Sequence, residues 1–206
     1  MISIKNNNSK TEKTLVLIKP DGVQRSLMGE IISRYERTGL KLIALKFVVP
    51  TPEMVEKHYN LDPSWRQRNG EKTIAGYKAK GLVPPSEDPI KVSGITLERL
   101  KKYLSSGPVA AMVWQGMNAV AMIKKITGST EPLSADVGTI RGDFMLDSYQ
   151  TADDDKRAVR NLTHISGSVE EAENEINHWF KPEEIIKYKL IQEGILYDVN
   201  LDGTLE

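Results

Sequence analysis

The chain has three histidines, and His164 is the one whose surroundings could support nucleophilic chemistry. It lies in a segment expected to be a loop, just before Ser168 and Glu171, whose spacing is the capping-box pattern of a helix that begins at Val169. Backbone N–H groups at a helix start attract phosphate and disfavour protonation of a nearby imidazole. His164 is therefore expected to be neutral at pH 7 and able to attack an electrophile.

Glu175 lies on the same predicted helix and could fix the tautomer of His164. A carboxylate that accepts the proton of one ring nitrogen leaves the lone pair of the other nitrogen free to attack. The competing interpretation of His164 is a capping or surface histidine. A structural role is favoured for His58, which ends an amphipathic segment, and for His178, which adjoins Trp179.

A histidine that accepts a phosphoryl group needs cations and hydrogen-bond donors around the phosphates. Candidates in the sequence are Lys19, Lys124, Thr130 and Arg141. Taken singly, each Lys or Arg among them is more often a surface charge than a ligand. The sequence contains neither the G-x-x-x-x-G-K-[ST] phosphate loop nor the H-R-D and D-F-G motifs of protein kinases. Those two mechanisms are therefore not supported.

Hydrophobic periodicity predicts the elements that would position these residues. Strands are expected at residues 14–19, 40–49 and 108–116, and helices at residues 26–39, 52–59, 118–128 and from Val169 onward. Residues 130–144 are expected to be a loop, and residues 147–161 a polar excursion before His164. This order of elements indicates an α/β (α+β) sandwich of the βαββαβ kind.

Residues 60–106 interrupt this order with several prolines and glycines. Two helical pieces are predicted there, near residues 70–80 and 96–104. Because the apolar content is too thin for a separate core, the segment is interpreted as a helical insertion within one domain of residues 14–206. The polar start, residues 1–13, is expected to be disordered or mobile.

Composition excludes several classes of protein and site. The 28 basic and 28 acidic side chains cancel, so no overall field attracts nucleic acid or a membrane. There is no cysteine, which removes disulfides and thiolate sites. The sequence has neither a signal-peptide pattern nor an apolar run of the roughly 18 residues that span a bilayer. A cytoplasmic protein is expected.

Several motifs taken in order resemble the nucleoside diphosphate kinase family. They are "IKPDGVQR", "HY", "SGPVAAMVW", "GSTEP", "GTIRGDF", "RNLTHISGSVEEAENEI" and the "WF" and "PEE" after it. The resemblance spans about residues 14–190 and implies a ferredoxin-like sandwich, an antiparallel sheet with helices on its faces. It also implies a cytoplasmic homo-oligomer, a hexamer or tetramer, that uses Mg²⁺ to move the γ-phosphoryl from an NTP to an NDP. The family's phosphorylated histidine falls on His164.

The resemblance also implies roles around the nucleotide. Glu175 would orient the ring of His164 directly or through Ser166. The residues that would hold the sugar and the phosphates are Lys19, Lys124, Thr130, Arg141 and Asn161, with Tyr59 beside them in the site.

Two positions depart from the family pattern. Lys124 stands where the family commonly has arginine, so a point charge replaces a bidentate fork. Gly167 stands where the family often has aspartate, so no metal ligand is directly assignable and Mg²⁺ would be held mainly by phosphates and water. The aromatic residue that stacks on the base would lie within residues 60–106 and is not identified, which leaves base preference open.

Two other function classes occur on the same architecture. RNA-recognition modules share the sandwich architecture, but they display aromatic residues and glycines on their central strands, unlike "TLVLIK" and "AAMVW" here. The other alternative is a catalytically reduced regulator that binds nucleotide on the same fold. Replacement of His164 by Asn or Gln should abolish phosphorylation and retain NDP binding if His164 is the nucleophile, and unchanged transfer would rule out that role.

Overall fold

The computed structural model describes residues 9–198 and 200–203. Of the segment predicted to be mobile, residues 1–8 lie outside the described part of the chain. The predicted boundary at residue 14 falls inside a strand, because η1 spans Ser9–Thr11 and β1 already begins at Glu12.

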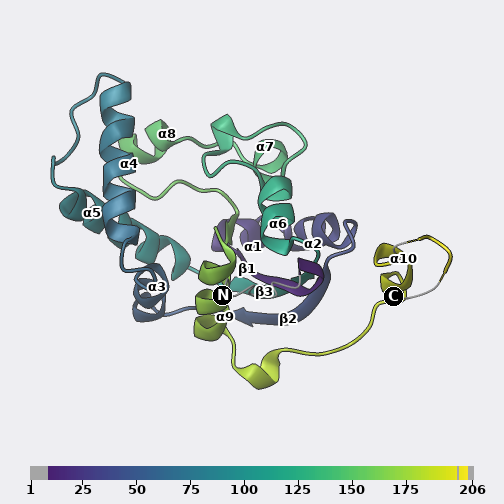
Figure 1. The fold of residues 1–206 in the computed structure, drawn as a ribbon. Coiled ribbons are helices and arrows are strands. Elements are labelled where there is room, and N and C mark those ends of the chain that lie inside the picture. The colour runs from purple at the N-terminus through teal and green to yellow at the C-terminus, as the bar shows by residue number, and fades with distance from the viewer. Residues whose placement is uncertain (1–8, 199, 204–206) are drawn as a thin grey trace, which may run out of the picture.

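A four-stranded sheet forms the centre of the molecule (Figure 1). Its strands are β1 Glu12–Ile18, β2 Lys41–Val48, β3 Val109–Gly116 and β4 Thr163–Ile165. Their order is β2-β3-β1-β4, and every neighbouring pair is antiparallel. This is the order of a ferredoxin-like sandwich, so the predicted fold class is confirmed.

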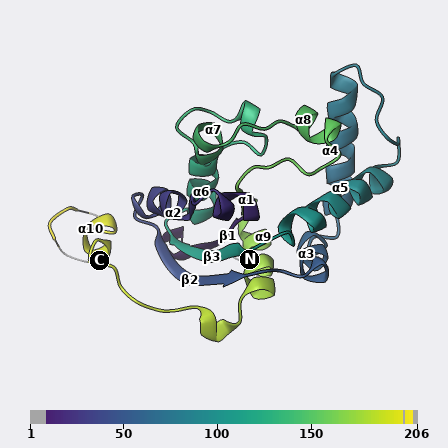
Figure 2. The same ribbon diagram turned by 180° about the vertical axis from the view of Figure 1, so that it is seen from behind.

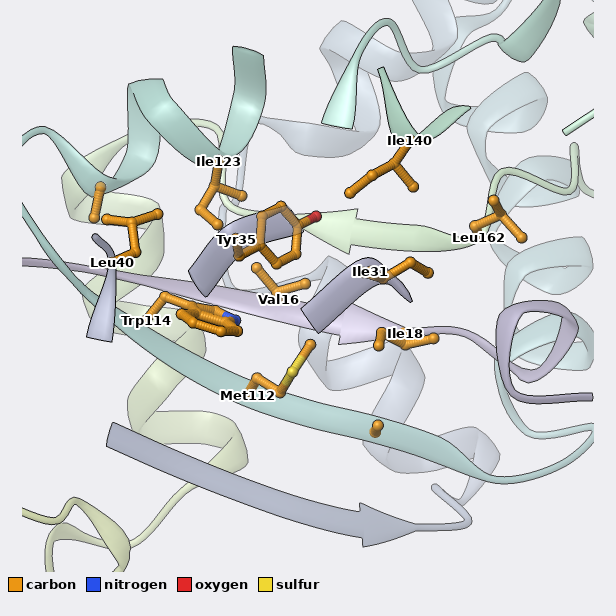
Figure 3. Close-up of a cluster of buried hydrophobic side chains, with 12 residues drawn as sticks. Val16, Ile18, Ile31, Tyr35, Leu40, Met112, Trp114, Ile123, Ile140 and Leu162 are labelled. Carbon is orange, nitrogen blue, oxygen red and sulfur yellow. The ribbon is translucent and has the colours of Figure 1, made fainter. Parts of the chain in front are cut away.

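Side chains of β1 enter two separate cores, one on each face of the sheet. Val16 and Ile18 pack with Tyr35 and Trp114 on the face shown in Figure 3. Leu15 and Leu17 join the second core on the opposite face. Because successive side chains of a strand point to opposite faces, a strand buried on both faces needs a continuous apolar run, which is what "LVLI" provides.

Helices cover both faces of this sheet (Figures 1 and 2). Their bounds are α1 Pro20–Gln24, α2 Met28–Glu36, α3 Pro52–Tyr59, α4 Trp65–Ala79, α5 Pro89–Leu104, α6 Ala119–Thr127, α7 Ile140–Phe144, α8 Tyr149–Asp154, α9 Val169–Trp179 and α10 Glu193–Leu196. Short 3-10 turns occur at η2 Pro132–Ser134 and η3 Pro182–Glu184. None of the helices in the described ranges is long and apolar enough to cross a membrane.

The insertion forms a pair of helices, α4 and α5, that project beyond the sheet (Figure 2). Both helices begin earlier than the sequence predicted. Asp88 caps α5 by accepting the N–H groups of Ile90 and Lys91, so Pro89 opens the helix and does not belong to a loop. The two helices approach closely, since a Cβ at Gly70 would overlap the carbonyl of Pro89.

Three short elements replace segments that were predicted to be irregular. The predicted loop of residues 130–144 ends in α7, and the polar excursion contains α8. The expectation that His164 lies in a loop is wrong, because His164 is the middle residue of β4. A strand of three residues is too short to show the alternation by which strands are recognised in a sequence.

Candidate active site

Strand β4 places His164 beside the central strand. Residue 164 pairs with Leu17 of β1, and the imidazole remains 14% exposed. After it, Ser168 caps α9 by accepting the N–H of Glu171, which confirms the predicted helix start at Val169. The second half of the capping box is absent, because the Glu171 carboxylate accepts the N–H of Gly167 instead of that of Ser168.

Glu175 contacts His164 directly, through its Oε1 at 2.7 Å from the ring Nε2. Its other oxygen, Oε2, accepts a hydrogen bond of 2.6 Å from the hydroxyl of Ser166. The Ser166 oxygen in turn accepts the backbone N–H of Leu15, so its own proton is available for Glu175. The structure thus brings together His164 and the two residues, Glu175 and Ser166, that the sequence analysis placed around it.

His58 is a residue of the site that sequence reasoning missed. It is 3% exposed, and its ring centroid lies 4.4 Å from that of His164. No periodic pattern could reveal this contact, because it depends on how α3 packs against α9 and β4. The pair "HY" at residues 58 and 59 was the available signal, and only Tyr59 was taken from it.

The electrostatic environment keeps the imidazole of His164 neutral. Burial lowers its pKa, and the positive charges of Lys19 and Arg141 lower it further, against an opposing effect of Glu171. Burial also raises the pKa of Glu175, while the donors His58 and Ser166 act in the opposite direction. With donors around both of its oxygens, Glu175 is best described as an ionised acceptor.

Lys19, Asn161 and Arg141 are linked by hydrogen bonds into a cationic cluster whose two charges act on His164. Lys19 and Arg141 are each 4% exposed, and neither forms an ion pair within the described part of the chain. The Lys19 ammonium donates to Asn161 Oδ1 at 2.7 Å and lies 5.3 Å from the centre of the Tyr103 ring. Burial and the charge of Arg141 lower the pKa of Lys19 to about 7, against the attraction of Asp21.

Arg141 is tied to the backbone around the site. Its three guanidinium nitrogens donate to the carbonyls of Asn161, Gly128 and Thr163 at 2.8–3.1 Å. A guanidinium has five N–H groups, so both terminal nitrogens keep one for a ligand. Arg141 therefore orders the backbone on both sides of residue 162 as well as carrying charge.

Two predicted phosphate ligands are less engaged. Thr130 is exposed, and its backbone carbonyl accepts the side-chain N–H of Asn161 at 2.8 Å. Lys124 is exposed on α6, and its ammonium makes no hydrogen bond or ion pair with any residue that the structure describes. The structure thus does not bring the Lys124 ammonium to the other site residues.

A pocket opens in front of His164. Its wall includes Tyr59, Leu61, Asp62, Trp65 and Glu171. The rings of Tyr59 and Trp65 lie 5.0 Å apart, and Trp65 is the first residue of α4. The insertion therefore contributes an aromatic face to the site.

His58, His164 and Glu175 have donor atoms within 4.8 Å of one another, as in a metal site. Each of these atoms, however, has a nearby protein partner within the same group, at 2.7 Å for His164 and 3.5 Å for His58. The cluster is explained by hydrogen bonding, and it needs no ion.

Comparison with known proteins gives a consistent result. Residues 12–66 and 93–185 match the family model described as nucleoside diphosphate kinase. A nucleoside diphosphate kinase of Pyrobaculum aerophilum is 44% identical over 180 residues, which is 85% of this chain and 98% of that protein. Nucleoside diphosphate kinase B of Bos taurus is 40% identical over 178 residues, covering 86% and 91% of the two chains.

Solved structures show the same relationship. The crystal structure of the NDP kinase from Pyrobaculum aerophilum superposes with a TM-score of 0.82 at 44% identity, covering 86% of this chain and 100% of that one. A transition-state mimic of the enzyme from Borrelia burgdorferi, with bound vanadate and ADP, gives a TM-score of 0.73 at 33% identity over 89% and 95% of the chains. Residues 67–92 of the insertion fall outside the ranges that match the family model.

Proposed function

This chain belongs to the nucleoside diphosphate kinase family, and on that premise we propose that it transfers a phosphoryl group from an NTP to an NDP through a phosphohistidine on His164. The observation that carries the proposal is the orientation of the His164 ring. Nε2 faces Glu175 at 2.7 Å, while Nδ1 has no hydrogen-bond partner among the described residues. The neutral ring then keeps its proton on Nε2 and a free lone pair on Nδ1.

The reaction runs in two half-reactions. The Nδ1 lone pair forms a bond to the γ-phosphorus, and the bond from that phosphorus to the β–γ bridging oxygen breaks, so the NDP leaves with the electron pair. The ring becomes cationic, and its Nε2–H remains hydrogen-bonded to Glu175, whose negative charge stabilises it. A terminal oxygen of a second NDP then attacks the phosphorus, and the N–P bond breaks to restore the neutral ring.

The cationic cluster would hold the phosphates. Lys19 and the two remaining N–H groups of Arg141 supply charge and donors, and Asn161 would bind the sugar hydroxyls near Lys19. Binding of a polyanion would raise the pKa of Lys19 from about 7 and keep it charged. Thr130 and Lys124 are proposed to contact the outer phosphates, Lys124 by extending from α6.

Mg²⁺ is proposed as the cofactor, carried in with the nucleotide. Its fit is tested by the wall of the pocket, whose lining includes Asp62 and Glu171 besides His164. The Asp62 carboxylate also pairs with Arg68, and that of Glu171 accepts the N–H of Gly167. Hard carboxylate oxygens suit this ion, which usually keeps several waters and binds one or two carboxylates besides phosphate. When bound, the ion neutralises phosphate charge during transfer.

Trp65 is proposed as the aromatic residue that stacks on the base. It lines the same pocket as His164 and Tyr59, and its ring lies 5.0 Å from that of Tyr59. Stacking accepts any base because every base presents a π-face, which predicts broad nucleotide specificity. Of the aromatic side chains in the insertion, Trp65 is thus the one that the pocket brings near the nucleophile.

The protein is further proposed to work in the cytoplasm as a homo-oligomer, a hexamer or tetramer, without nucleic acid or membrane partners. The support for assembly is β2, at one end of the sheet, where Leu45 and Phe47 are 54% and 59% exposed, followed directly by Val49, which is 64% exposed. An edge strand with a row of exposed apolar side chains favours self-association. Native mass spectrometry would count the subunits, and a monomer would contradict this part of the proposal.

Replacement of His164 by Gln tests the proposed function. The variant should lose phosphoryl transfer and still bind ADP, measured by calorimetry, because the cationic cluster and the pocket stay intact. His178→Gln is the matched control, since the ring of His178 contacts the carbonyl of Met54 and does not contact Glu175 through a hydrogen bond. Unchanged transfer by His164→Gln would refute the assignment, and binding without transfer by the wild type would favour the regulator.

A further inference from the structure

His58 is a buried titratable group that the transfer reaction does not use directly. It lies near the end of α3, and its ring packs among the rings of Tyr59, His164, His178 and Trp179. The ring centroid is 4.9 Å from that of Tyr59, 4.4 Å from that of His164 and 5.9 Å from that of Trp179. The tautomer of this histidine is defined by its neighbours, because one ring nitrogen faces a hydrogen-bond donor and the other faces an acceptor.

Trp179 fixes that tautomer. The indole N–H of Trp179 donates to Nδ1 of His58 at 3.1 Å. An indole nitrogen can only donate, so Nδ1 must be the acceptor and a neutral ring must carry its proton on Nε2. His58 therefore has a single N–H group, on Nε2, that can donate to another residue.

This N–H faces Glu175. Nε2 of His58 lies 3.5 Å from Oε1, the same oxygen that contacts Nε2 of His164 at 2.7 Å. The second oxygen is occupied by the hydroxyl of Ser166. Two imidazole N–H groups thus converge on one oxygen of a carboxylate, and catalytic hydrogen bonds that are long in the free enzyme often shorten when substrate binds.

The surroundings keep His58 neutral. Burial lowers its pKa, and His164, His178 and Lys19 lower it further, while Glu175 opposes them. The other titratable ring in contact is that of Tyr59, whose pKa is raised by burial, so that Tyr59 remains uncharged. His58 therefore acts as a hydrogen-bond donor and not as an acid or a cation.

We propose that His58 is a positioning residue for the phosphoryl transfer: its Nε2–H, oriented by Trp179, holds the Glu175 carboxylate in line with the ring of His164. This inference rests on the proposed function. Without the second donor, Oε1 can turn away from His164, and the ring loses the contact that fixes its tautomer and direction.

Two amide substitutions test the proposal because each mimics one ring nitrogen. The amide of Gln reaches the place of Nε2 and can donate to Glu175, whereas the amide of Asn reaches the place of Nδ1 and can only serve Trp179. We expect His58→Asn to lower kcat about tenfold, the loss of one hydrogen bond to a charged group, and His58→Gln to stay within about threefold of the wild type. KM should change less than kcat in both variants.

The pH dependence of kcat separates positioning from packing. Loss of a donor to an ionised carboxylate raises the pKa of that carboxylate, so the acid limb should move to higher pH in His58→Asn and not in His58→Gln. Equal losses in both variants with unmoved acid limbs would show that His58 only fills space. Full activity of His58→Asn, or a better Asn than Gln variant, would overturn the proposal.

A measurement on the wild type keeps the test valid if a variant fails to fold. Long-range ¹H–¹⁵N spectra of the free protein distinguish the two neutral tautomers of each histidine. The proposal requires a proton on Nε2 of His58, and a proton on Nδ1 would overturn it. Failure of the proposed function would show differently, as an absence of labelled His164 whichever tautomer His58 adopts.

Discussion

Two groups of side chains act on His164, and they differ in how the protein compensates their charges. On the Glu175 side, a carboxylate network of His164, Glu175, Ser166, His58 and Trp179 pairs its donors with acceptors from the protein itself. In the cationic cluster, by contrast, Lys19 and Arg141 are buried without an ion pair in the described ranges. A network that is satisfied within the protein fixes positions, whereas a buried charge without a counter-ion favours the binding of an anion.

Under the proposed function, this difference explains how His164 would attack a phosphate while remaining neutral. The network holds the proton of His164 on the nitrogen away from the substrate, and the cluster lowers the pKa of the same ring. Both effects act on His164, but only the cluster is expected to bind ligand. Each of the following variants alters either the carboxylate network or the groups proposed to bind phosphate.

Removal of the Lys19 charge should have the largest effect. Lys19→Met keeps most of the volume, and loss of one preorganised cation at a transferring phosphoryl group should lower kcat/KM roughly 10²–10³-fold. Steady-state kinetics with ATP and GDP would measure it. Lys13→Met is the control, because Lys13 is exposed on β1, the strand that Lys19 directly follows. If activity falls less than about threefold, Lys19 does not hold phosphate. The proposed difference between the cationic cluster and the carboxylate network would then be wrong.

Loss of the Glu175 charge should have the next largest effect. Glu175→Gln places an amide N–H against one of the donors Ser166 and His164, so kcat should fall roughly 10–100-fold while ADP affinity stays nearly constant. Glu173→Gln, exposed on the same helix, is the control. A variant that loses ADP binding as strongly as kcat would show that the network also binds ligand.

The buried Lys19 should make the ligand-free protein more stable as pH rises. Its folded pKa of about 7 lies below the ordinary value of 10.5, so above pH 7 the unfolded chain binds more protons and stability increases with pH. Between pH 7 and 9 the gain over Lys19→Met should be roughly 2 kcal/mol by urea unfolding. Parallel pH curves for the two proteins would contradict the buried charge.

Lys124→Arg should have the smallest effect. The side chain is exposed and unbonded within the described residues, so stability should change by less than about 0.5 kcal/mol. If Lys124 reaches the outer phosphates, the bidentate guanidinium should lower KM for ATP about two- to fivefold without altering kcat. Lys125→Arg on the same helix is the control, and equal KM values would remove Lys124 from the site.

The fold and the helix start that follows His164 were predictable because their signals are local. The buried run of β1 and the Ser168 cap of α9 lie within a few neighbouring residues, and both were placed correctly. The contact between Glu175 and His164 was anticipated from their shared segment. Local patterns thus predicted the elements and one half of the site.

What the sequence could not predict depends on contacts between distant segments. His58 is separated from Trp179 by 121 residues, and its burial appears only when α3 packs against α9. Strand β4 is too short for alternation to reveal it, and the early starts of α4 and α5 depend on Asp88 and on the packing at Gly70. These features follow from tertiary packing and not from periodicity.

The most direct test of the account is covalent labelling of His164. The purified protein is mixed with γ-labelled ATP and Mg²⁺, the label is mapped by mass spectrometry, and GDP is then added. The account predicts an acid-labile, base-stable label on His164 that moves to GDP. A protein that remains unlabelled, or one labelled elsewhere with a group that GDP cannot remove, would contradict it.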